Sequence, residues 1–253
     1  MISSFSYGIP HNTKLLIVII DGLPYYLVPK KNHMLSFIHQ KAIETGTFIP
    51  LEPILGYSDA NYATLFTGTY PEVHGFWCSY SLKCNDTSSY PKYLAYLSII
   101  DEFPSLIRIL VKYGLYTFLS KCYQHTPPFR NIPFNMLNLF SYSEVKIAEP
   151  SFLKVPTLYD LLRKKRIGFA ILNAPEYKYP SDFIFSHFRR WNTFFNLYKM
   201  LLQRHSISLV TVILGQADAA AHFFGLYSKR YDNALCLVDK VVKKLLREAE
   251  NTW

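Results

Sequence analysis

Continuous apolar runs mark the buried strands of this chain. Leu15 to Ile20 is an aliphatic run that ends at Asp21-Gly22, and Ile207 to Leu214 is a second one. Uninterrupted runs of this kind are typical of parallel strands that helices cover on both faces. A shorter run, Phe169 to Leu172, follows a glycine. The pattern therefore predicts the strands of a mainly parallel sheet.

Segments with apolar residues at helical spacing alternate with these strands. They are His33 to Thr45, Asp59 to Thr67, Thr157 to Arg166 and Ser228 to roughly Glu250. Glycines that follow the first three segments are typical helix stops. Strands that alternate with helices predict an α/β fold, in which a layered, mainly parallel central sheet is flanked by helices. Sites in such sheets gather beyond the carboxyl ends of the strands.

The stretch between about Phe76 and Pro150 breaks this alternation. It is rich in aromatic residues, Asn and Ser, and contains Pro127-Pro128. We interpret residues 78–150 as an irregular insertion or cap over the core rather than a second domain. The whole chain, residues 1–253, is then expected to form a single domain.

Within this insertion, Leu94 to Leu119 is rich in apolar residues. Charges interrupt it at Asp101, Glu102, Arg108 and Lys112. The pattern favours an amphipathic helix over a membrane span, and it leaves contact with a membrane surface open.

The amino-acid composition indicates which kinds of partner and which cellular compartment suit this chain. The net charge of +9 favours anionic partners such as phosphate esters, nucleotides, nucleic acids or lipid headgroups. Nucleic acid is disfavoured because the basic residues are scattered and no recognition motif is present. The N-terminus lacks the order of a signal peptide, and the four cysteines show no paired C-x-x-C spacing. We therefore expect reduced thiols in a cytoplasmic protein.

A hydroxyl residue, Ser58, opens the second predicted helix. That helix ends at Gly68, and the run Thr69-Tyr70-Pro71-Glu72-Val73-His74-Gly75 follows it. The first N–H groups of a helix lack intrahelical partners and lie at its positive pole, so this position suits a phosphate. The alternative is that Ser58 only caps the helix.

Two carboxylates and an imidazole follow the two long strands. Asp21 comes directly after the first strand, and Asp218 and His222 follow the strand that ends at Leu214. If this last stretch is helical, residues four apart face the same way and can share a divalent cation, typically zinc. The alternatives are a common Asp-Gly turn and an ordinary Asp–His helix pair.

In combination and order, these pieces resemble the type I phosphodiesterase/nucleotide pyrophosphatase family, which belongs to the alkaline phosphatase superfamily. The resemblance covers most of residues 14–77 and 155–247, and the stretch from Asn61 to Gly75 keeps the family's spacing. It implies an alkaline-phosphatase-like fold. It also implies hydrolysis of a phosphodiester or nucleotide pyrophosphate with two divalent metal ions, zinc being the expected one.

The resemblance assigns a role to each candidate residue. Asp21 would bind the metal that activates the nucleophile, and Ser58 would contact that metal and attack phosphorus. Asn61 would hydrogen-bond a non-bridging phosphate oxygen. Asp218 and His222 would hold the second metal beside the leaving group. The implied substrate is a small phosphate ester, either a nucleotide or a lipid headgroup.

Some residues depart from the family pattern or lie beside its catalytic ones. Asp59 and Ala60 stand where relatives often place an aromatic residue and a proline. A carboxylate beside the nucleophile would repel an anionic substrate unless it faces a metal or solvent. His74, in the turn motif, is expected to be structural rather than a metal ligand.

The family pattern also continues beyond Trp253, the last residue of this sequence. Relatives add a strand that ends in Ser-Asp-His-Gly-Met and a later metal-binding histidine. The resemblance therefore implies a C-terminally incomplete domain that lacks some metal ligands and is inactive in isolation if nothing replaces them. Two functions stay open: a metal-dependent phosphoesterase with a serine nucleophile, and a non-catalytic family member that binds anions or nucleotides. The sequence leaves the oligomeric state open.

Overall fold

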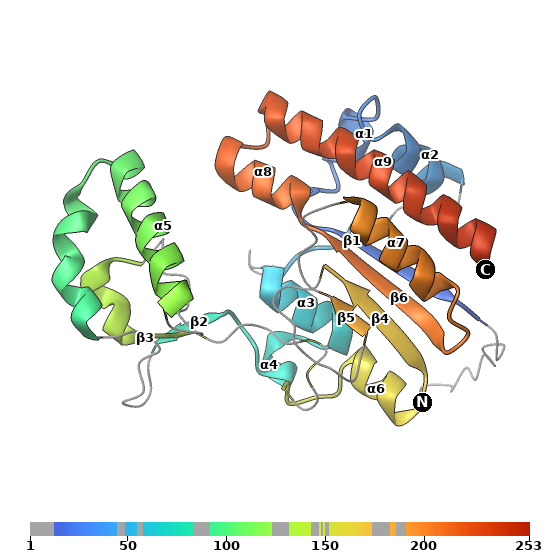
Figure 1. Ribbon diagram of the computed structural model, residues 1–253, viewed down its shortest axis with the longest axis horizontal. Helices are drawn as coiled ribbons and strands as arrows, with labels where there is room; N and C mark the ends of the chain where they lie inside the picture. Colours follow the sequence, from blue (N-terminus) through green and yellow to red (C-terminus); the bar gives the residue numbers. More distant parts are fainter. Residues whose placement is uncertain are drawn as a thin grey trace. The chain divides into compact units, whose positions relative to one another are not determined.

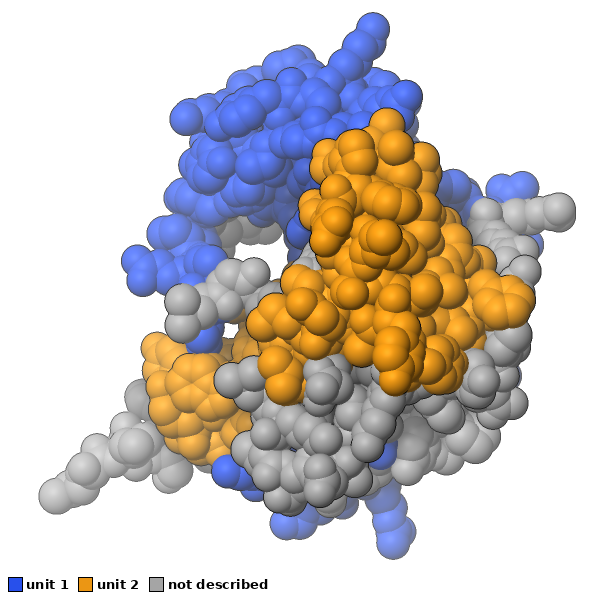
Figure 2. All heavy atoms as spheres, turned by 90° about the vertical axis from the view of Figure 1, so that its left-hand side faces the viewer, with its two compact units in different colours: residues 1–54, 146–253 blue, residues 55–145 orange. Residues whose placement is uncertain are grey.

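The computed structural model describes residues 13–44, 49–54, 58–82, 92–122, 132–142, 147, 149, 152–173, 183–185 and 191–253. The chain divides into two compact units, which Figure 2 shows in different colours. Unit 1 comprises residues 1–54 and 146–253, and unit 2 comprises residues 55–145. The single domain with an insertion at residues 78–150 stays a prediction, and unit 2 begins earlier than that insertion.

Unit 1 is built on a parallel sheet of four strands (Figure 1). In spatial order they are β1 (Leu15–Ile20), β6 (Ile207–Leu214), β4 (Gly168–Leu172) and β5 (Phe183–Phe185). Leu15 lies opposite Leu209, and Ile20 lies opposite Leu214. The carboxyl ends of β1 and β6 are therefore neighbours. The predicted α/β fold with a mainly parallel sheet is confirmed.

The helices of unit 1 flank this sheet. They are α1 (Leu27–Lys30), α2 (Ser36–Glu44), α6 (Leu158–Lys164), α7 (Trp191–Leu202), α8 (Gln216–Phe224) and α9 (Lys229–Thr252). The sequence predicted α2, α6 and α9 to within a few residues at each end. Local capping fixes where α6 begins, because the Asp160 N–H donates to Thr157 Oγ1 and the Thr157 N–H donates to Asp160 Oδ2.

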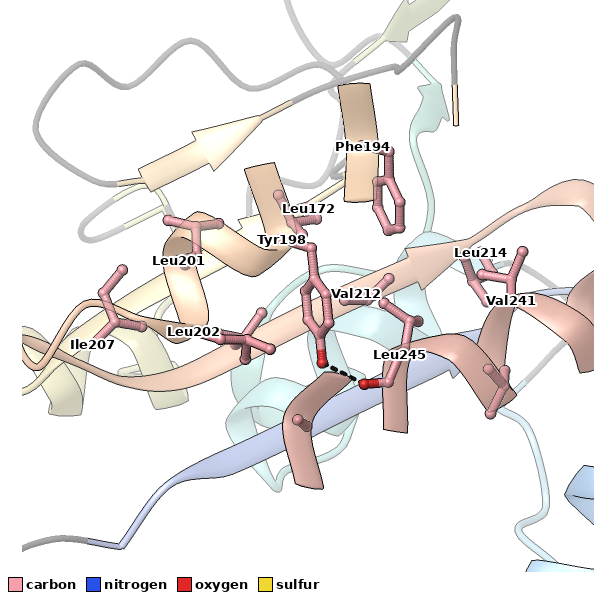
Figure 3. Close-up of a cluster of buried hydrophobic side chains, with 14 of the residues drawn as sticks. Leu172, Phe194, Tyr198, Leu201, Leu202, Ile207, Val212, Leu214, Val241 and Leu245 are labelled. Atoms are coloured by element: carbon pink, nitrogen blue, oxygen red, sulfur yellow. Dashed lines mark hydrogen bonds between the residues drawn. The ribbon is translucent and has the colours of Figure 1, made fainter. Parts of the chain in front are cut away.

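One face of the sheet packs against α7 and α9 (Figure 3). Val210 and Val212 of β6 lie in a buried cluster with Tyr198 of α7 and Leu245 of α9. The Tyr198 hydroxyl donates to the Leu245 carbonyl oxygen across 2.9 Å. Burial raises the pKa of Tyr198, so the hydroxyl stays protonated and can donate.

The opposite face of the sheet meets α6. Side chains alternate along a strand, so Thr211 points away from the face that carries Val210 and Val212. The buried Tyr159 of α6 donates its hydroxyl to Thr211 Oγ1 across 3.0 Å. Helices therefore cover both faces of β6, which explains why its sequence is almost continuously apolar.

Unit 2 is mainly helical in the part that the structure describes. Its elements are α3 (Ser58–Thr67), α4 (Pro71–His74), β2 (Tyr80–Leu82), the 3₁₀ helix η1 (Lys92–Glu102), α5 (Ser105–Cys122), the 3₁₀ helix η2 (Phe134–Leu139) and β3 (Phe140–Tyr142). β2 and β3 form an antiparallel pair. Unit 2 has its own buried hydrophobic cluster, formed by Leu94, Leu119, Phe134 and Leu137.

The structure corrects the expectation of one helix over Leu94 to Leu119. A 3₁₀ helix and an α-helix, η1 and α5, share this stretch and meet at Pro104. Proline disfavours helical geometry at the residue before it, which explains the break. Among the residues described, no helix combines the length and the apolar character needed to cross a membrane.

Candidate active site

Backbone hydrogen bonds join the two predicted metal-binding carboxylate residues of unit 1. The Asp21 N–H donates to the Leu214 carbonyl oxygen across 2.9 Å, at the paired ends of β1 and β6. The Asp218 N–H, in the first turn of α8, donates to the Asp21 carbonyl oxygen across 3.1 Å. The sheet register thus brings together two residues that are far apart in the sequence.

Gly22 allows this close approach. Its φ of +72° is left-handed, and a Cβ at this position would lie 2.3 Å from the Asp218 Cα. The Tyr231 hydroxyl of α9 donates to the Gly22 carbonyl oxygen across 2.8 Å. Burial is the main cause that raises the pKa of Tyr231, to about 12, so this donor keeps its proton at neutral pH. The Asp-Gly pair is therefore part of a fixed junction rather than a free turn.

His222 completes the polar group in unit 1. Its Nε2 lies 3.3 Å from Asp218 Oδ1, one helical turn away in α8. Burial raises the pKa of Asp218, the negative charge of Asp21 raises it further, and His222 acts in the opposite direction. The Asp218 side chain is 33% exposed and that of His222 is 78% exposed, so the group faces solvent.

The donor chemistry of this group suits a divalent cation. Two mutually repelling carboxylates and an imidazole are ligands that zinc accepts, and a cation between them would relieve the repulsion. Catalytic zinc normally has three protein ligands. Within the described part of the chain, no group of three or more His, Cys, Asp or Glu side chains is arranged to hold a metal. Asp21, Asp218 and His222 fit the chemistry and supply only part of a coordination shell.

Gln216 is a polar residue at this junction that the sequence reasoning missed. It begins α8, two residues before Asp218. Its side-chain Oε1 is buried and has no hydrogen-bond partner among the described residues. A buried acceptor without a partner is costly and therefore uncommon. Its sequence position gave no signal of this.

Ser58 and Asn61 lie in unit 2. Ser58 is the first residue of α3, and Asn61 follows three residues later, so both belong to the same side of the helix. Both residues are partly buried. The structure therefore groups these two residues at the start of α3, and it groups Asp21, Asp218 and His222 at the ends of β1 and β6.

Asp59, the residue after Ser58, has a partner inside unit 2. Its Oδ2 accepts a hydrogen bond from the hydroxyl of Ser79, which is buried. From the sequence, this carboxylate was expected to face a metal ion or solvent. The Asp59 carboxylate instead accepts a hydrogen bond from the buried Ser79 hydroxyl, which offsets part of the negative charge of the carboxylate.

His74 links the turn motif to α3. The Phe76 N–H donates to His74 Nδ1 across 3.1 Å, which leaves the proton of the neutral ring on Nε2. Nε2 can then donate to Thr64 Oγ1, 3.0 Å away. Burial lowers the pKa of His74, and the nearby Glu72 partly opposes this. With both ring nitrogens used internally, the geometry agrees with the structural role expected from the sequence.

Comparison with known proteins then identifies the family. The four-stranded parallel sheet with its flanking helices is an alkaline-phosphatase-like fold. The chain belongs to the type I phosphodiesterase/nucleotide pyrophosphatase family, whose sequence model matches residues 15–252. A comparison with curated protein sequences finds no significant match.

The fold is similar to that of murine ectonucleotide pyrophosphatase/phosphodiesterase 5. It matches a structure of that protein and one of an inactive variant in complex with AMP, each with a TM-score of 0.58 and 12% identity. Each match covers 95% of this chain and 53% of the murine chain. This chain thus spans about half the length of the proteins it resembles.

Proposed function

We propose that this chain provides the nucleophile and part of the metal site of a phosphoesterase that hydrolyses a phosphodiester or a nucleotide pyrophosphate. The observation that carries the proposal is the junction of Asp21 and Asp218, made by the paired ends of β1 and β6 in a member of this family. Ligand sites of open parallel sheets lie at that edge.

The candidate residues take the following roles in the proposal. Ser58 Oγ attacks phosphorus while the bond from phosphorus to the leaving alcohol or phosphate breaks and that group departs. Water then cleaves the phosphoester on the serine, which releases the phosphate product and restores the hydroxyl. The Asn61 side-chain amide donates to a non-bridging phosphate oxygen and fixes the orientation of the group. Asp21 and Ser58 would hold one metal ion, and Asp218 and His222 would hold another. When bound, two divalent ions, zinc by the chemistry of these donors, supply charge neutralisation and lower the pKa of the serine hydroxyl.

A nucleotide is the substrate that the observations favour. The murine neighbour was solved with AMP, and the net charge of +9 suits an anionic ligand. A phosphorylated lipid headgroup offers the same phosphate chemistry and is the second candidate. We also propose, from the unpaired cysteine spacing, that the chain works in the reducing environment of the cytoplasm.

A non-catalytic role in anion or nucleotide binding is the alternative function. The incomplete ligand group among the described residues favours it, because loosely held metal would leave Ser58 unactivated. For both functions, the N-terminus of α3 offers backbone N–H groups that suit a phosphate.

Hydrolysis of bis(p-nitrophenyl) phosphate by the zinc-reconstituted chain tests the proposal. Ser58→Ala should lower turnover by about a thousandfold or more, because the attacking oxygen is lost. Ser105→Ala is the matched control, since Ser105 begins α5 as Ser58 begins α3. Its turnover should stay within about twofold of the parent value.

Metal and ligand binding separate the two functions. About two tightly bound zinc ions per chain, reduced in Asp218→Asn, would support the catalytic role. AMP binding by calorimetry without bound zinc and without turnover would favour the binding role. Unchanged turnover in Ser58→Ala would overturn the assignment of the nucleophile.

A further inference from the structure

The outward side of α5 is apolar over most of its length. Its exposed side chains are Leu106, Ile107, Ile109, Leu110, Tyr113 and Phe118. Leu106, Leu110 and Phe118 are 69%, 62% and 63% exposed. At helical spacing these residues, with Gly114 and Thr117, occupy one continuous side of the helix, which carries no charged residue between Ser105 and Phe118. We call this side the α5 face.

Arg108 and Lys112, the charged residues of α5 whose side chains the structure describes, point the other way. Lys112 is buried and pairs with Asp101 Oδ1 at 2.5 Å, and its Nζ also donates to the Ile132 carbonyl oxygen across 2.7 Å. Arg108 donates to the Asp101 carbonyl oxygen across 3.1 Å. A helix on a water-facing surface normally shows the reverse arrangement, with its charges outward. The α5 face therefore lacks the polar groups that would suit it to water.

The 3₁₀ helix η1, which packs against α5, adds to this surface. Residues three apart align along a 3₁₀ helix. Tyr93, Tyr96 and Ile99 of η1 form such a row and are 47%, 87% and 63% exposed. Large exposed apolar surfaces of this kind mark binding sites for proteins or membranes. Unit 2 thus carries two exposed apolar rows on neighbouring elements.

Charge decides between the occupants of this surface. From residue 103 through residue 143 the sequence has no Asp or Glu, whereas it has Lys121 and Arg130 in addition to the inward-pointing Arg108 and Lys112. A second copy of the chain would bring another +9 of like charge, which opposes close association. An anionic surface is attracted instead. Tyrosines such as Tyr93, Tyr96 and Tyr113 suit the headgroup region of a membrane, because the ring is apolar and the hydroxyl is polar.

We propose that the α5 face and the exposed row of η1 bind unit 2 to the surface of an anionic lipid membrane. The apolar side chains enter the boundary between headgroups and acyl chains, and α5 lies in the plane of the surface. The cytoplasmic leaflet carries such anionic lipids and attracts basic proteins. This binding is peripheral, and it requires neither metal nor catalytic turnover.

Flotation of the purified chain with lipid vesicles tests the proposal. We expect binding to phosphatidylcholine vesicles that contain about 30 mol% phosphatidylserine, and weaker binding to pure phosphatidylcholine. Leu110→Glu should lower the partition coefficient about tenfold or more, because it removes an apolar side chain that would enter the membrane and adds a negative charge. Tyr96→Glu, at the most exposed position of the η1 row, should act in the same direction.

Ile43→Glu is the matched control. Ile43 is 66% exposed, close to the value of Leu110, and lies in α2 of unit 1. Its partition coefficient should stay within about twofold of the parent value, and circular dichroism checks that each variant is folded. Absence of binding to both vesicle types would overturn the proposal. Equal losses in Ile43→Glu and Leu110→Glu would do the same. Self-association in sedimentation that only Leu110→Glu abolishes, without vesicle binding, would instead identify a contact between copies.

Discussion

Gly22 and Asp218 lie so close that the first cannot carry a side chain. A Cβ on Gly22 would lie 2.3 Å from the Asp218 Cα and 2.5 Å from its backbone nitrogen, the atom that donates to Asp21. Backbone atoms cannot move aside as a flexible side chain can. The spacing of the two carboxylate residues therefore depends on a glycine that has no chemistry of its own.

Replacing Gly22 by alanine should separate these residues. The left-handed φ of +72° disfavours any side chain, and the new Cβ would push α8 away from β1. We expect the free energy of unfolding to fall by about 2–4 kcal/mol, measured by urea titration. Zinc binding, measured by calorimetry, should weaken in the same variant.

Gly114→Ala provides the matched control. Gly114 lies in α5, and a Cβ there would meet nothing within 4 Å. Alanine favours helix over glycine, so stability should rise or stay unchanged, by at most about 1 kcal/mol. Equal losses in the two variants would contradict the role given to Gly22.

Asp239 of α9 should stabilise the start of α2. Although it is only 7% exposed, its Oδ1 accepts from the Ile38 N–H across 2.9 Å and its Oδ2 accepts from the Phe37 N–H across 3.2 Å. These first N–H groups of α2 have no intrahelical partner, and the carboxylate also faces the positive pole of the helix. Asp239→Ala should cost about 1–3 kcal/mol in thermal or urea unfolding. Asp239→Asn, which keeps one acceptor oxygen, should cost less than Asp239→Ala.

His74 should make stability depend on pH. Burial lowers its pKa in the folded state, and a proton on Nδ1 would face the donating Phe76 N–H. The unfolded state, with a pKa near the usual value of about 6.5, binds this proton first as the pH falls. The contribution of neutral His74 is therefore fully present above about pH 6.5 and is lost as the pH drops below it.

Urea titrations at a series of pH values measure this effect. The parent chain should lose stability as the pH falls below about 6.5. A His74→Gln variant lacks the titrating ring and should show a flatter profile over that range. Identical slopes in the two proteins would assign the pH dependence to other groups.

The hydrogen bond between Ser79 and Asp59 should favour anion binding near Ser58. Ser79→Ala removes the donor, so the Asp59 carboxylate keeps more of its negative charge toward an incoming phosphate. We expect the Kd for AMP to rise about 3–10-fold in calorimetry at low salt. The double variant Asp59→Asn/Ser79→Ala carries no such charge and should bind AMP at least as well as the parent. Failure of that rescue would contradict an electrostatic role for Asp59.

The sequence predicted the parts of this molecule that local patterns encode. Continuous apolar runs indicated β1 and β6, and the apolar stripe of α9 with Ser228 before it indicated the last helix. The order of Asp21, Ser58 and Asp218 pointed to the family, because motif spacing is a property of sequence alone.

Features that depend on distant contacts could not be predicted in this way. Asp239 looks like one more polar residue of a helix until α2 is placed against it. Lys112 and Asp101 interrupted an apolar segment and suggested a polar outer side, whereas their pairing turns these charges inward. For Asp239 the partner lies 201 positions away in the sequence. For Lys112 and Asp101 the break at Pro104 places the two residues in different helices, which a single helical period does not represent.

The pairing of β1 with β6 also affects the order in which parts of the molecule fold. Leu15 pairs with Leu209, so most of the chain separates the two strands, and contacts of such long range form slowly. The cluster around Leu94 and Leu137 joins residues much nearer in the sequence. We expect pulse-labelling hydrogen exchange to protect amides of α5 before those of β1, and the reverse order would contradict this. During synthesis, Asp21 would then leave the ribosome long before it meets Asp218, and the junction of these two carboxylate residues would be among the last features of the molecule to form.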